Sequence, residues 1–287
     1  MRVLLTGRAG QLGTALAEAL EGTAEVVAHD RSTLDLADPA QVVARVREAA
    51  PDVVINAAAY TAVDRAEDDV ATARTVNAVA PGLLARECKA RSALLIHYST
   101  DYVFDGAKRE PYVEDDPVAP LNAYGRTKLE GERAITASGC AHLVLRTSWV
   151  YGPTGANFLL TMLRAGAARD ELRVVDDQHG APTSTLQLAR ATRELLALGR
   201  ARLAANPGIY HATAAGQTSW FGFAQAIFAQ REKRPRLVPI ASAEWPTPAK
   251  RPAWSVLSSD RLAQAFGVRL GPWSEGLAEV MARLPRG

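Results

Sequence analysis

Three glycines at intervals of three residues stand near the start of the sequence, between an apolar run and a segment with helical periodicity. They are Gly7, Gly10 and Gly13. A strand–turn–helix with this spacing permits a tight turn, close backbone approach and close helix packing. It also leaves the N–H groups of the first helical turn free for phosphate oxygens. A purely structural turn is the alternative, but the strand before it and the helix after it favour dinucleotide binding.

Apolar runs of strand length alternate with longer helical segments through the first half of the chain. We expect strands over residues 3–6, 25–30, 52–56, 93–98 and 142–146, and helices over residues 11–20, 38–51, 71–91 and 122–137. Continuous apolar strands separated by helices predict an α/β fold with a doubly wound, Rossmann-like parallel sheet. Right-handed crossovers would bring the carboxyl ends of the strands to one crevice.

Glycine, proline and tryptophan become more frequent after about residue 150, and the alternation loosens. Helical patterns remain near residues 157–168, 184–198, 219–229 and 274–283. We expect a dinucleotide-binding Rossmann domain over residues 1–150, with a return segment near residues 180–212. A smaller mixed α/β lobe for the substrate would occupy residues 151–287.

The composition excludes several classes of protein. With 48% hydrophobic and 22% charged residues, the chain can bury a core and is not a disordered protein. Its net charge is +2 with no basic block, so we expect neither a nucleic-acid nor a membrane partner. Two cysteines and five histidines lack metal-ligand spacing, so we expect no metal, although Mg²⁺ stays open. No apolar run approaches the roughly 18 residues of a membrane span, and we expect a cytoplasmic protein.

The residues after the second expected strand bear on the choice of dinucleotide. Asp30 ends this strand, where an acidic side chain binds the adenosine ribose hydroxyls and repels a 2′-phosphate. Arg31 follows, and its guanidinium would pair with that phosphate instead. The sequence therefore leaves NADH and NADPH open, and a solvated strand end is the alternative without function.

A tyrosine and a lysine lie one helical turn apart in the helix expected over residues 122–137. The spacing of Tyr124 and Lys128 predicts that both side chains point to one face. An ammonium beside a phenol favours the phenolate, so we expect a lowered tyrosine pKa and a better proton donor near neutral pH. The lysine would also hold the nicotinamide ribose. An exposed helix pair is the alternative.

The fourth expected strand ends in polar residues. Thr100 and Asp101 follow its apolar run, and this carboxyl end must point into the same crevice as Tyr124. Thr100 would hydrogen-bond a substrate oxygen, and Asp101 would bind a sugar hydroxyl or fix the loop. An ordinary polar strand exit is the alternative.

Together with further strings in the chain, these elements resemble the extended short-chain dehydrogenase/reductase family, most closely its dTDP-4-dehydrorhamnose reductase branch. The resemblance covers nearly the whole chain, and its strings keep the family's order and spacing. The matching strings are residues 6–13, 56–64, 97–104, 120–128, 146–152, 177–183 and 246–252.

The resemblance implies a role for each matching residue. The implied catalytic residues are Thr100, Tyr124 and Lys128. The implied cofactor-binding residues are Gly7, Gly10, Gln11, Leu12, Gly13, Asp30, Arg31, Asp35, Leu36, Ala57, Ala58, Ala59, Tyr60, Tyr124 and Lys128. The implied substrate-binding residues are Thr100, Asp101, Trp149 and Arg251.

The activity that the resemblance implies is a reduction. The 4-keto group of dTDP-4-dehydro-6-deoxy-L-mannose would be reduced to give dTDP-L-rhamnose, a precursor of surface polysaccharides, with NADPH or NADH as cofactor. The expected partner is the dTDP-sugar, and the expected state is a monomer or a homodimer. Some relatives hold Mg²⁺ through a carboxylate of the first helix, where this chain has Thr14 and Ala15, so no metal is predicted.

Two other functions compete with this one. Sugar-nucleotide dehydratases of the superfamily carry Thr-Asp-Glu at the fourth strand end, and this chain has Tyr102 in place of the glutamate. That difference favours reduction over elimination, although another sugar-nucleotide dehydrogenase or epimerase stays open. The second rival is a non-catalytic subunit similar to the beta subunit of methionine adenosyltransferase. Intact Thr100, Tyr124 and Lys128 favour an enzyme.

Overall fold

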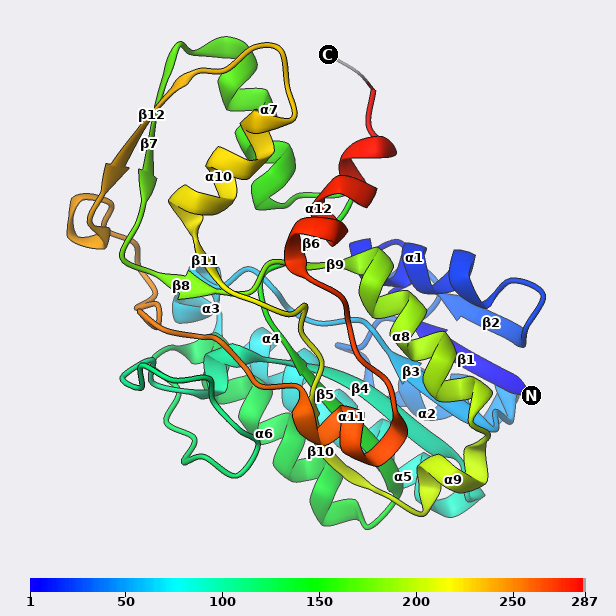
Figure 1. Ribbon diagram of the computed structural model, residues 1–287. Coiled ribbons are helices and arrows are strands. Elements are labelled where there is room, and N and C mark those ends of the chain that lie inside the picture. Colours follow the sequence, from blue (N-terminus) through cyan, green and yellow to red (C-terminus); the bar gives the residue numbers. More distant parts are fainter. Residues whose placement is uncertain (286–287) are drawn as a thin grey trace.

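A six-stranded parallel sheet forms the centre of the protein in the computed structural model, which describes residues 1–285 (Figure 1). Its strands are β1 (Arg2–Thr6), β2 (Glu25–His29), β3 (Val53–Asn56), β4 (Leu94–Thr100), β5 (Ala141–Thr147) and β10 (Gly208–His211). Their order in the sheet is β10-β5-β4-β3-β1-β2, and every neighbouring pair is parallel. The predicted doubly wound α/β fold is therefore confirmed.

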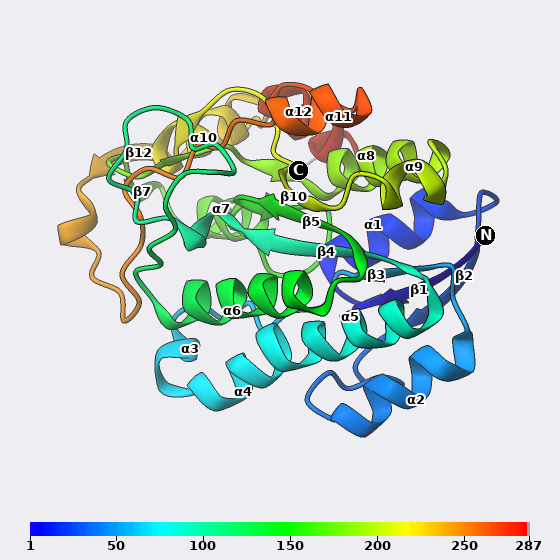
Figure 2. The ribbon, with the colours of Figure 1, turned by 90° about the horizontal axis from the view of Figure 1, so that it is seen from below.

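Helices cover both faces of this sheet (Figure 2). One layer consists of α2 (Pro39–Ala49), α5 (Ala80–Arg91) and α6 (Ala123–Ser138). The other consists of α1 (Gln11–Leu20), α8 (Thr185–Ala197), α9 (Arg200–Ala204), α11 (Asp260–Phe266) and α12 (Trp273–Ala282). Successive strand residues alternate between the two layers: Leu4 packs in the core with α2 and α5, and Leu5 packs in the core with α1 and α8. Both faces are thus apolar, which explains the continuous hydrophobic strands of the sequence.

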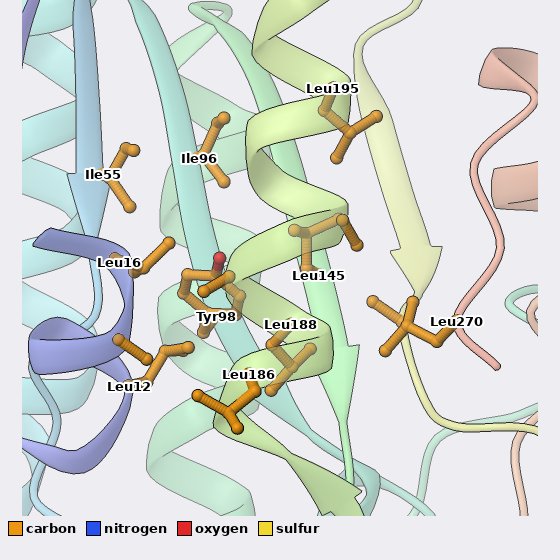
Figure 3. Packing of buried hydrophobic residues seen from close by; sticks show 14 of the residues in the cluster. Leu12, Leu16, Ile55, Ile96, Tyr98, Leu145, Leu186, Leu188, Leu195 and Leu270 are labelled. Carbon is orange, nitrogen blue, oxygen red and sulfur yellow. The ribbon is translucent and has the colours of Figure 1, made fainter. Parts of the chain in front are cut away.

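The core on the α1–α8 side is the larger one, and its side chains interdigitate between helix and sheet (Figure 3). Leu16 of α1 and Leu188 of α8 belong to one apolar cluster with Ile55 of β3 and Ile96 of β4, and all four are almost completely buried. Full burial of one such side chain contributes about 1.5–3 kcal/mol to folding. This packing holds the start of α1 against the end of β1, where the glycine turn lies.

The segment predicted as helical over residues 71–91 is not one continuous α-helix. α3 (Arg65–Asp68) and α4 (Val70–Arg74) lead into a π-helical turn, Thr75–Val79, and only then does α5 begin. The side chain of Asn77 in this turn accepts a hydrogen bond from the Tyr60 N–H at 2.9 Å and donates one to the Tyr60 carbonyl at 3.1 Å. Asn77 of the widened turn therefore fastens the loop after β3, and π-helical turns are frequent at functional sites.

The second half of the chain adds a group of elements at one end of the sheet (Figure 1). They are β6 (Val150–Tyr151), α7 (Phe158–Ala168), β7 (Glu171–Val175), β8 (His179–Gly180), β9 (Thr183–Ser184), β11 (Thr218–Ser219), α10 (Trp220–Ala229) and β12 (Arg236–Ile240). Strands β7 and β12 pair in parallel, and Leu172 and Phe228 belong to a separate apolar cluster there.

The chain returns to the central sheet between these elements, because α8 covers it and β10 pairs with β5. We propose that this return segment belongs with residues 1–150 in a dinucleotide-binding domain, and that the remaining elements form a substrate lobe. Residues 286 and 287 of the expected lobe lie outside the described residues.

One ion pair is completely buried between α6 and β5. Arg146 donates to both carboxylate oxygens of Glu132, at 3.0 and 2.7 Å, and the two side chains are 2% and 1% exposed. The Ser99 hydroxyl donates a further bond to Glu132 at 2.5 Å, and the Phe104 ring lies 5.1 Å from the guanidinium carbon. A buried charge with these partners is tolerated, whereas the same charge alone is strongly destabilising.

We expect Arg146→Met to lower the free energy of unfolding by about 3–5 kcal/mol, because Glu132 would stay buried without its counter-charge. The double variant Arg146→Met, Glu132→Leu should recover most of this loss, since it removes both charges. Urea unfolding followed by circular dichroism measures both variants. A double variant no more stable than the single one would contradict the assignment of the cost to an unpaired charge.

Candidate active site

The strand order reverses beside β1, and this reversal locates the crevice. Strand β2 pairs with one edge of β1 and strand β3 with the other. The loops after β1 and β3 therefore lead to opposite faces of the sheet and leave space between them at the carboxyl ends. Gly7 follows β1, Ala57 follows β3 and Asp101 follows β4, so all three lie at this edge.

The glycine turn fits its surroundings only because it carries no side chains. Gly7 has a φ of +75°, and a Cβ on it would lie 2.8 Å from the Ala58 nitrogen. A Cβ on Gly13 would overlap the Gly7 carbonyl oxygen. Gly10 is the N-cap of α1, and no side chain caps this end of the helix. The turn is therefore an open backbone cradle at a helix N-terminus, and it fits the pyrophosphate of a dinucleotide.

The side chains next to this turn point away from it. Gln11 donates from Nε2 to the Ala156 carbonyl at 3.1 Å and accepts from Nδ2 of Asn157 at 2.8 Å. It thereby ties the turn to the segment before α7. Leu12 is 8% exposed and packs in the core. Both residues therefore offer a ligand their backbone rather than their side chains.

The residues predicted around the adenosine divide between loop and core. Asp30 accepts from the hydroxyl of Ser32 at 2.6 Å and from its N–H at 2.9 Å, and these bonds lower the pKa of its carboxyl. Arg31 reaches Asp35 at 3.4 Å and keeps 84% of its side chain exposed. Leu36 is 5% exposed and packs in the core, so its side chain cannot line a ligand site.

The loop after β3 passes directly beside the glycine turn. Ala57, Ala58 and Ala59 are all partly exposed there, and Ala58 provides the backbone that Gly7 approaches. The hydroxyl of Tyr60 donates to Asp69 at 3.2 Å, so its polar end is engaged by the α3–α4 segment.

The start of α6 brings Tyr124 to the end of β4. Asn122 caps this helix, and its Oδ1 accepts from the Gly125 N–H at 2.8 Å. A Cβ on Gly125 would overlap the Tyr102 carbonyl, so the helix packs directly against the 3-10 turn Asp101–Val103. The rings of Tyr102 and Tyr124 meet edge to face, with centroids 5.8 Å apart.

Lys128 is buried one turn further along α6, and its amine is engaged by β4. Its Nζ donates to the Tyr98 carbonyl at 2.6 Å and lies 3.1 Å from Nε2 of His97. Burial lowers the pKa of Lys128 to about 8 and raises the pKa of Tyr124 to about 12. The predicted lowering of the Tyr124 pKa by the ammonium is therefore wrong, because removal of the phenol from water dominates.

Thr100 and Asp101 form a closed pair at the end of β4. The Thr100 hydroxyl donates to Oδ1 of Asp101 at 2.9 Å and accepts from the Tyr102 N–H at 3.1 Å. Asp101 is 2% exposed, and within residues 1–285 its Oδ2 has no hydrogen-bond partner. Burial raises the pKa of Asp101 to about 6. The Thr100 hydroxyl is thus held in one orientation beside Tyr124.

Trp149 and Trp220 form a stacked pair beyond the end of β5. Trp149 has a left-handed backbone with φ of +47°, which directs its ring toward the start of α10. The two indole rings lie 3.4 Å apart with only 2° between their planes. A stacked pair of this kind is a rigid apolar surface that a flat ring or a sugar face could contact.

Arg251 is already paired. Its guanidinium donates to both carboxylate oxygens of Asp64, at 3.1 and 2.9 Å, and these bonds lower the pKa of Asp64. The pair joins the loop after β3 to the segment after β12, where Asn122 also donates to the Lys250 carbonyl at 2.9 Å. A diphosphate bound at Arg251 would therefore share the guanidinium with Asp64 or displace the Asp64 carboxylate from it.

Sequence reasoning missed several residues that the structure brings next to the predicted ones. Asn56 and His97 are polar side chains within apolar strands, and that interruption is the signal that could have found them. Asp64 contacts Arg251, 187 positions later in the sequence, and Trp220 contacts Trp149, 71 positions earlier. No local sequence pattern predicts such pairs.

Two further observations bear on ligands and surroundings. Across residues 1–285, no three His, Cys, Asp or Glu side chains are arranged so that they could hold a metal ion. In the same part of the chain, no helix is both long enough and apolar enough to cross a membrane.

We expect Asp101→Asn to stabilise the protein increasingly as the pH rises. The folded-state pKa of Asp101, about 6, lies above the ordinary pKa of 3.8, so its stabilising contribution is full below pH 3.8 and is lost as the pH rises through 6. The asparagine side chain cannot ionise. Its free energy of unfolding, relative to that of the wild type, should therefore rise by about 3 kcal/mol between pH 4 and pH 8. Urea unfolding across that range measures the difference. A pH-independent difference would contradict the raised pKa.

Comparison with known proteins places the chain in a family. Residues 1–286 match the family model described as RmlD substrate binding domain. A dTDP-4-dehydrorhamnose reductase of Burkholderia thailandensis is 48% identical, and the match covers 95% of each chain. A probable dTDP-4,6-dihydroxy-2-methyloxan-3-one 4-ketoreductase of Streptomyces antibioticus is 44% identical, with 97% of this chain and 94% of that one covered.

Among solved structures, a dTDP-4-dehydrorhamnose reductase of Bacillus anthracis in complex with NADP superposes with a TM-score of 0.93. It is 35% identical to this chain, and the match covers 98% of this chain and 99% of that one. Sequence and fold thus agree over the whole length, which confirms the predicted resemblance. The chain belongs to the RmlD substrate binding domain family, within the dTDP-4-dehydrorhamnose reductase branch of the short-chain dehydrogenases/reductases.

Proposed function

We propose that this protein reduces the 4-keto group of dTDP-4-dehydro-6-deoxy-L-mannose to give dTDP-L-rhamnose, with NADPH as cofactor. The observation that carries the proposal is the position of Tyr124. A partly buried tyrosine beside Thr100, at the same edge of the sheet as the open glycine cradle, is arranged to protonate an oxygen where a dinucleotide binds. The 48% identity to a dTDP-4-dehydrorhamnose reductase over 95% of each chain supports the choice of reaction.

The cofactor assignment rests on the glycine turn and on the loop after β2. The open N-terminus of α1 would hold the pyrophosphate through backbone N–H groups. Asp30 is tied into its own loop by Ser32, while the exposed guanidinium of Arg31 would turn from Asp35, 3.4 Å away, toward a 2′-phosphate. This arrangement favours NADPH over NADH, in line with the NADP complex of the Bacillus anthracis relative. When bound, the cofactor supplies the hydride that reduces the ketone carbon.

The side chains of the site handle the proton and the developing charge. The raised pKa of Tyr124 keeps its phenol protonated at neutral pH, so the proton is in place when an alkoxide forms on the substrate. Thr100, fixed by Asp101 and the Tyr102 N–H, would orient that oxygen. Lys128 would hold a cofactor hydroxyl and, once protonated, stabilise the phenolate that remains.

The substrate would occupy the space between the two halves of the chain. Trp149 and its partner Trp220 would pack against the sugar or the base, and Asp101 would anchor the loop that meets the sugar. Arg251 would bind the diphosphate after exchanging part of its bond with Asp64. Tyr102, partly exposed and with a raised pKa, stands where a dehydratase would need an acid, so elimination is disfavoured.

We also infer a cytoplasmic location and a monomer or a homodimer. The Streptomyces antibioticus relative is named for 4-ketoreduction of a different dTDP-sugar. The reaction type is thus common to both relatives, and the sugar is what an assay must decide. Loss of NADPH absorbance on adding dTDP-4-dehydro-β-L-rhamnose is the expected result, and its absence would overturn the proposal.

We expect Tyr124→Phe to lower kcat by about 10²–10⁴-fold with little change in KM, because the variant loses only the donated proton. Tyr210→Phe is the matched control: the Tyr210 hydroxyl donates to the Asn206 carbonyl at 2.9 Å, remote from the site, and its loss should leave kcat intact. Steady-state kinetics with NADPH measure both variants. Undiminished turnover in Tyr124→Phe would refute its role as proton donor.

We expect Arg31→Ala to weaken NADPH binding by about tenfold and NADH binding much less, because one charge-assisted bond to the 2′-phosphate is lost at an exposed position. Titration of protein fluorescence with each cofactor measures the two dissociation constants. An equal rise in both dissociation constants would show that Arg31 does not bind the 2′-phosphate.

A further inference from the structure

The side chain of Gln11 joins the glycine turn to the second half of the chain. Gln11 is the first residue of α1, and both ends of its amide are engaged by the segment that precedes α7. Nε2 donates to the Ala156 carbonyl at 3.1 Å, and Oε1 accepts from Nδ2 of Asn157 at 2.8 Å. The backbone of Gln11 therefore belongs to the cofactor cradle, while its side chain holds an element of the proposed substrate lobe.

The segment that receives Gln11 is shaped around it. Gly155 has a φ of +79°, and a Cβ on it would lie 2.7 Å from Cγ of Gln11. A residue with a side chain at this position would both strain the left-handed backbone and displace the glutamine. The contact is therefore a packed junction between two parts of the fold, and it differs from a loose pairing of surface side chains.

The two amides meet in one orientation only. The Leu160 N–H points at Oδ1 of Asn157 at 3.0 Å, and a backbone N–H can only donate, so the other amide atom of Asn157 is the nitrogen. That nitrogen donates to Gln11 and to the Gly152 carbonyl at 3.0 Å. The Ala156 carbonyl can only accept, so it must face the nitrogen of Gln11. Each amide is thus fixed by a backbone group on one side and by the other amide on the other side.

Asn157 passes this contact on to α7, because it is the N-cap of that helix. Its side chain holds the Leu160 N–H, and its carbonyl accepts from the Thr161 N–H at 3.0 Å. A capping side chain stabilises the first turn of its helix. A change in the position of Gln11 therefore acts on the first turn of α7, which begins at Phe158.

The start of α7 in turn contacts the aromatic pair predicted to meet the sugar nucleotide. The ring centroids of Phe158 and Trp220 are 4.6 Å apart, and Trp220 stacks on Trp149. Closely packed rings are coupled, because a shift of one ring opens a void beside the next. A continuous series of contacts thus runs from the glycine turn to the face of the indole pair.

A pyrophosphate in the glycine turn would act on this series from its other end. The first turn of α1 offers its N–H groups to a ligand, and the N–H of Gln11 is the first of them. A ligand that binds these groups restricts the backbone of Gln11, and the two amide bonds pass this restriction to the cap of α7. Two ligands that order the same element strengthen each other, and the effect is equal in both directions.

We propose that Gln11 is a positioning residue that couples the dinucleotide site to the sugar-nucleotide site. Through Asn157, a bound pyrophosphate orders the start of α7 and the aromatic pair, so the sugar nucleotide binds more tightly when the cofactor is present. No contact between the two ligands is needed for this coupling. The identity of the ligands rests on the proposed function, but the first test below uses the dinucleotide site alone.

Hydrogen exchange followed by NMR reads the effect on α7. The probe is ADP-ribose, which carries the pyrophosphate but no nicotinamide. At saturation in the wild type, we expect it to slow exchange of the Leu160 and Thr161 N–H groups by about fivefold or more, because both are bonded to Asn157. Gln11→Leu keeps the backbone N–H and the approximate size of the side chain. It should still bind ADP-ribose, but the added protection of α7 should be absent.

Two further variants separate the contact from general stability. Asn157→Ser keeps a capping hydroxyl for α7 but is too short to reach Gln11, so the protection should again be absent. Gln264→Leu is the matched control, since Gln264 is exposed on α11, well separated from α7 (Figure 1), and the protection should remain. Protection that persists in both Gln11→Leu and Asn157→Ser overturns the proposal, and so does a wild type that shows none.

Calorimetric titration with dTDP then measures the coupling between the two sites. We expect the wild type to bind dTDP about five- to tenfold more tightly when ADP-ribose is bound, and Gln11→Leu to bind it equally with and without ADP-ribose. A merely structural role would weaken dTDP binding by the same factor in both states, and that result contradicts the proposal. A wild type that does not bind dTDP would reject the proposed function, while the exchange measurements still decide the role of Gln11.

Discussion

At the carboxyl edge of the sheet, the backbones after β1 and β3 approach so closely that a Cβ on Gly7 would lie 2.8 Å from the Ala58 nitrogen. This contact forces the turn to be bare of side chains and leaves the N-terminus of α1 open. It also places the loop after β3 beside the turn, where the π-helical turn fastens it through Asn77. The cofactor cradle and the position of the loop therefore have one cause, the close packing of two loops at a reversal of strand order.

Removal from water sets the electrostatics of the site. The pKa of Tyr124 rises to about 12, that of Asp101 rises to about 6 and that of Lys128 falls to about 8. Each shift favours the uncharged form, as burial requires. A reductase benefits from this, because its phenol must keep a proton until the alkoxide needs it. Activation of the phenol by a permanent ammonium, the simpler expectation, would instead leave a partly ionised tyrosine without the proton to give.

The fold could be predicted from the sequence because its signals are local: apolar strands of four to seven residues, helical periodicity and a glycine turn between them. The positions of Gly7, Tyr124 and Lys128 could be predicted in the same way. Their interactions could not. The Asn56–His97 bond, the Asp64–Arg251 pair and the Trp149–Trp220 stack join distant segments, and only packing brings them together. For Leu12 and Leu36, the motif position did not tell that their side chains face the core.

The central claim is that desolvation of its phenol raises the pKa of Tyr124 and keeps this residue protonated in the resting enzyme. A ¹³Cζ-tyrosine NMR titration of the cofactor-free protein tests it most directly, with Tyr124→Phe to assign the resonance among seven tyrosines. The account predicts a phenol that does not ionise until the pH approaches its pKa of about 12. Ionisation with a midpoint well below the ordinary value of about 10 would contradict it, and would restore the ammonium as the group that controls the proton.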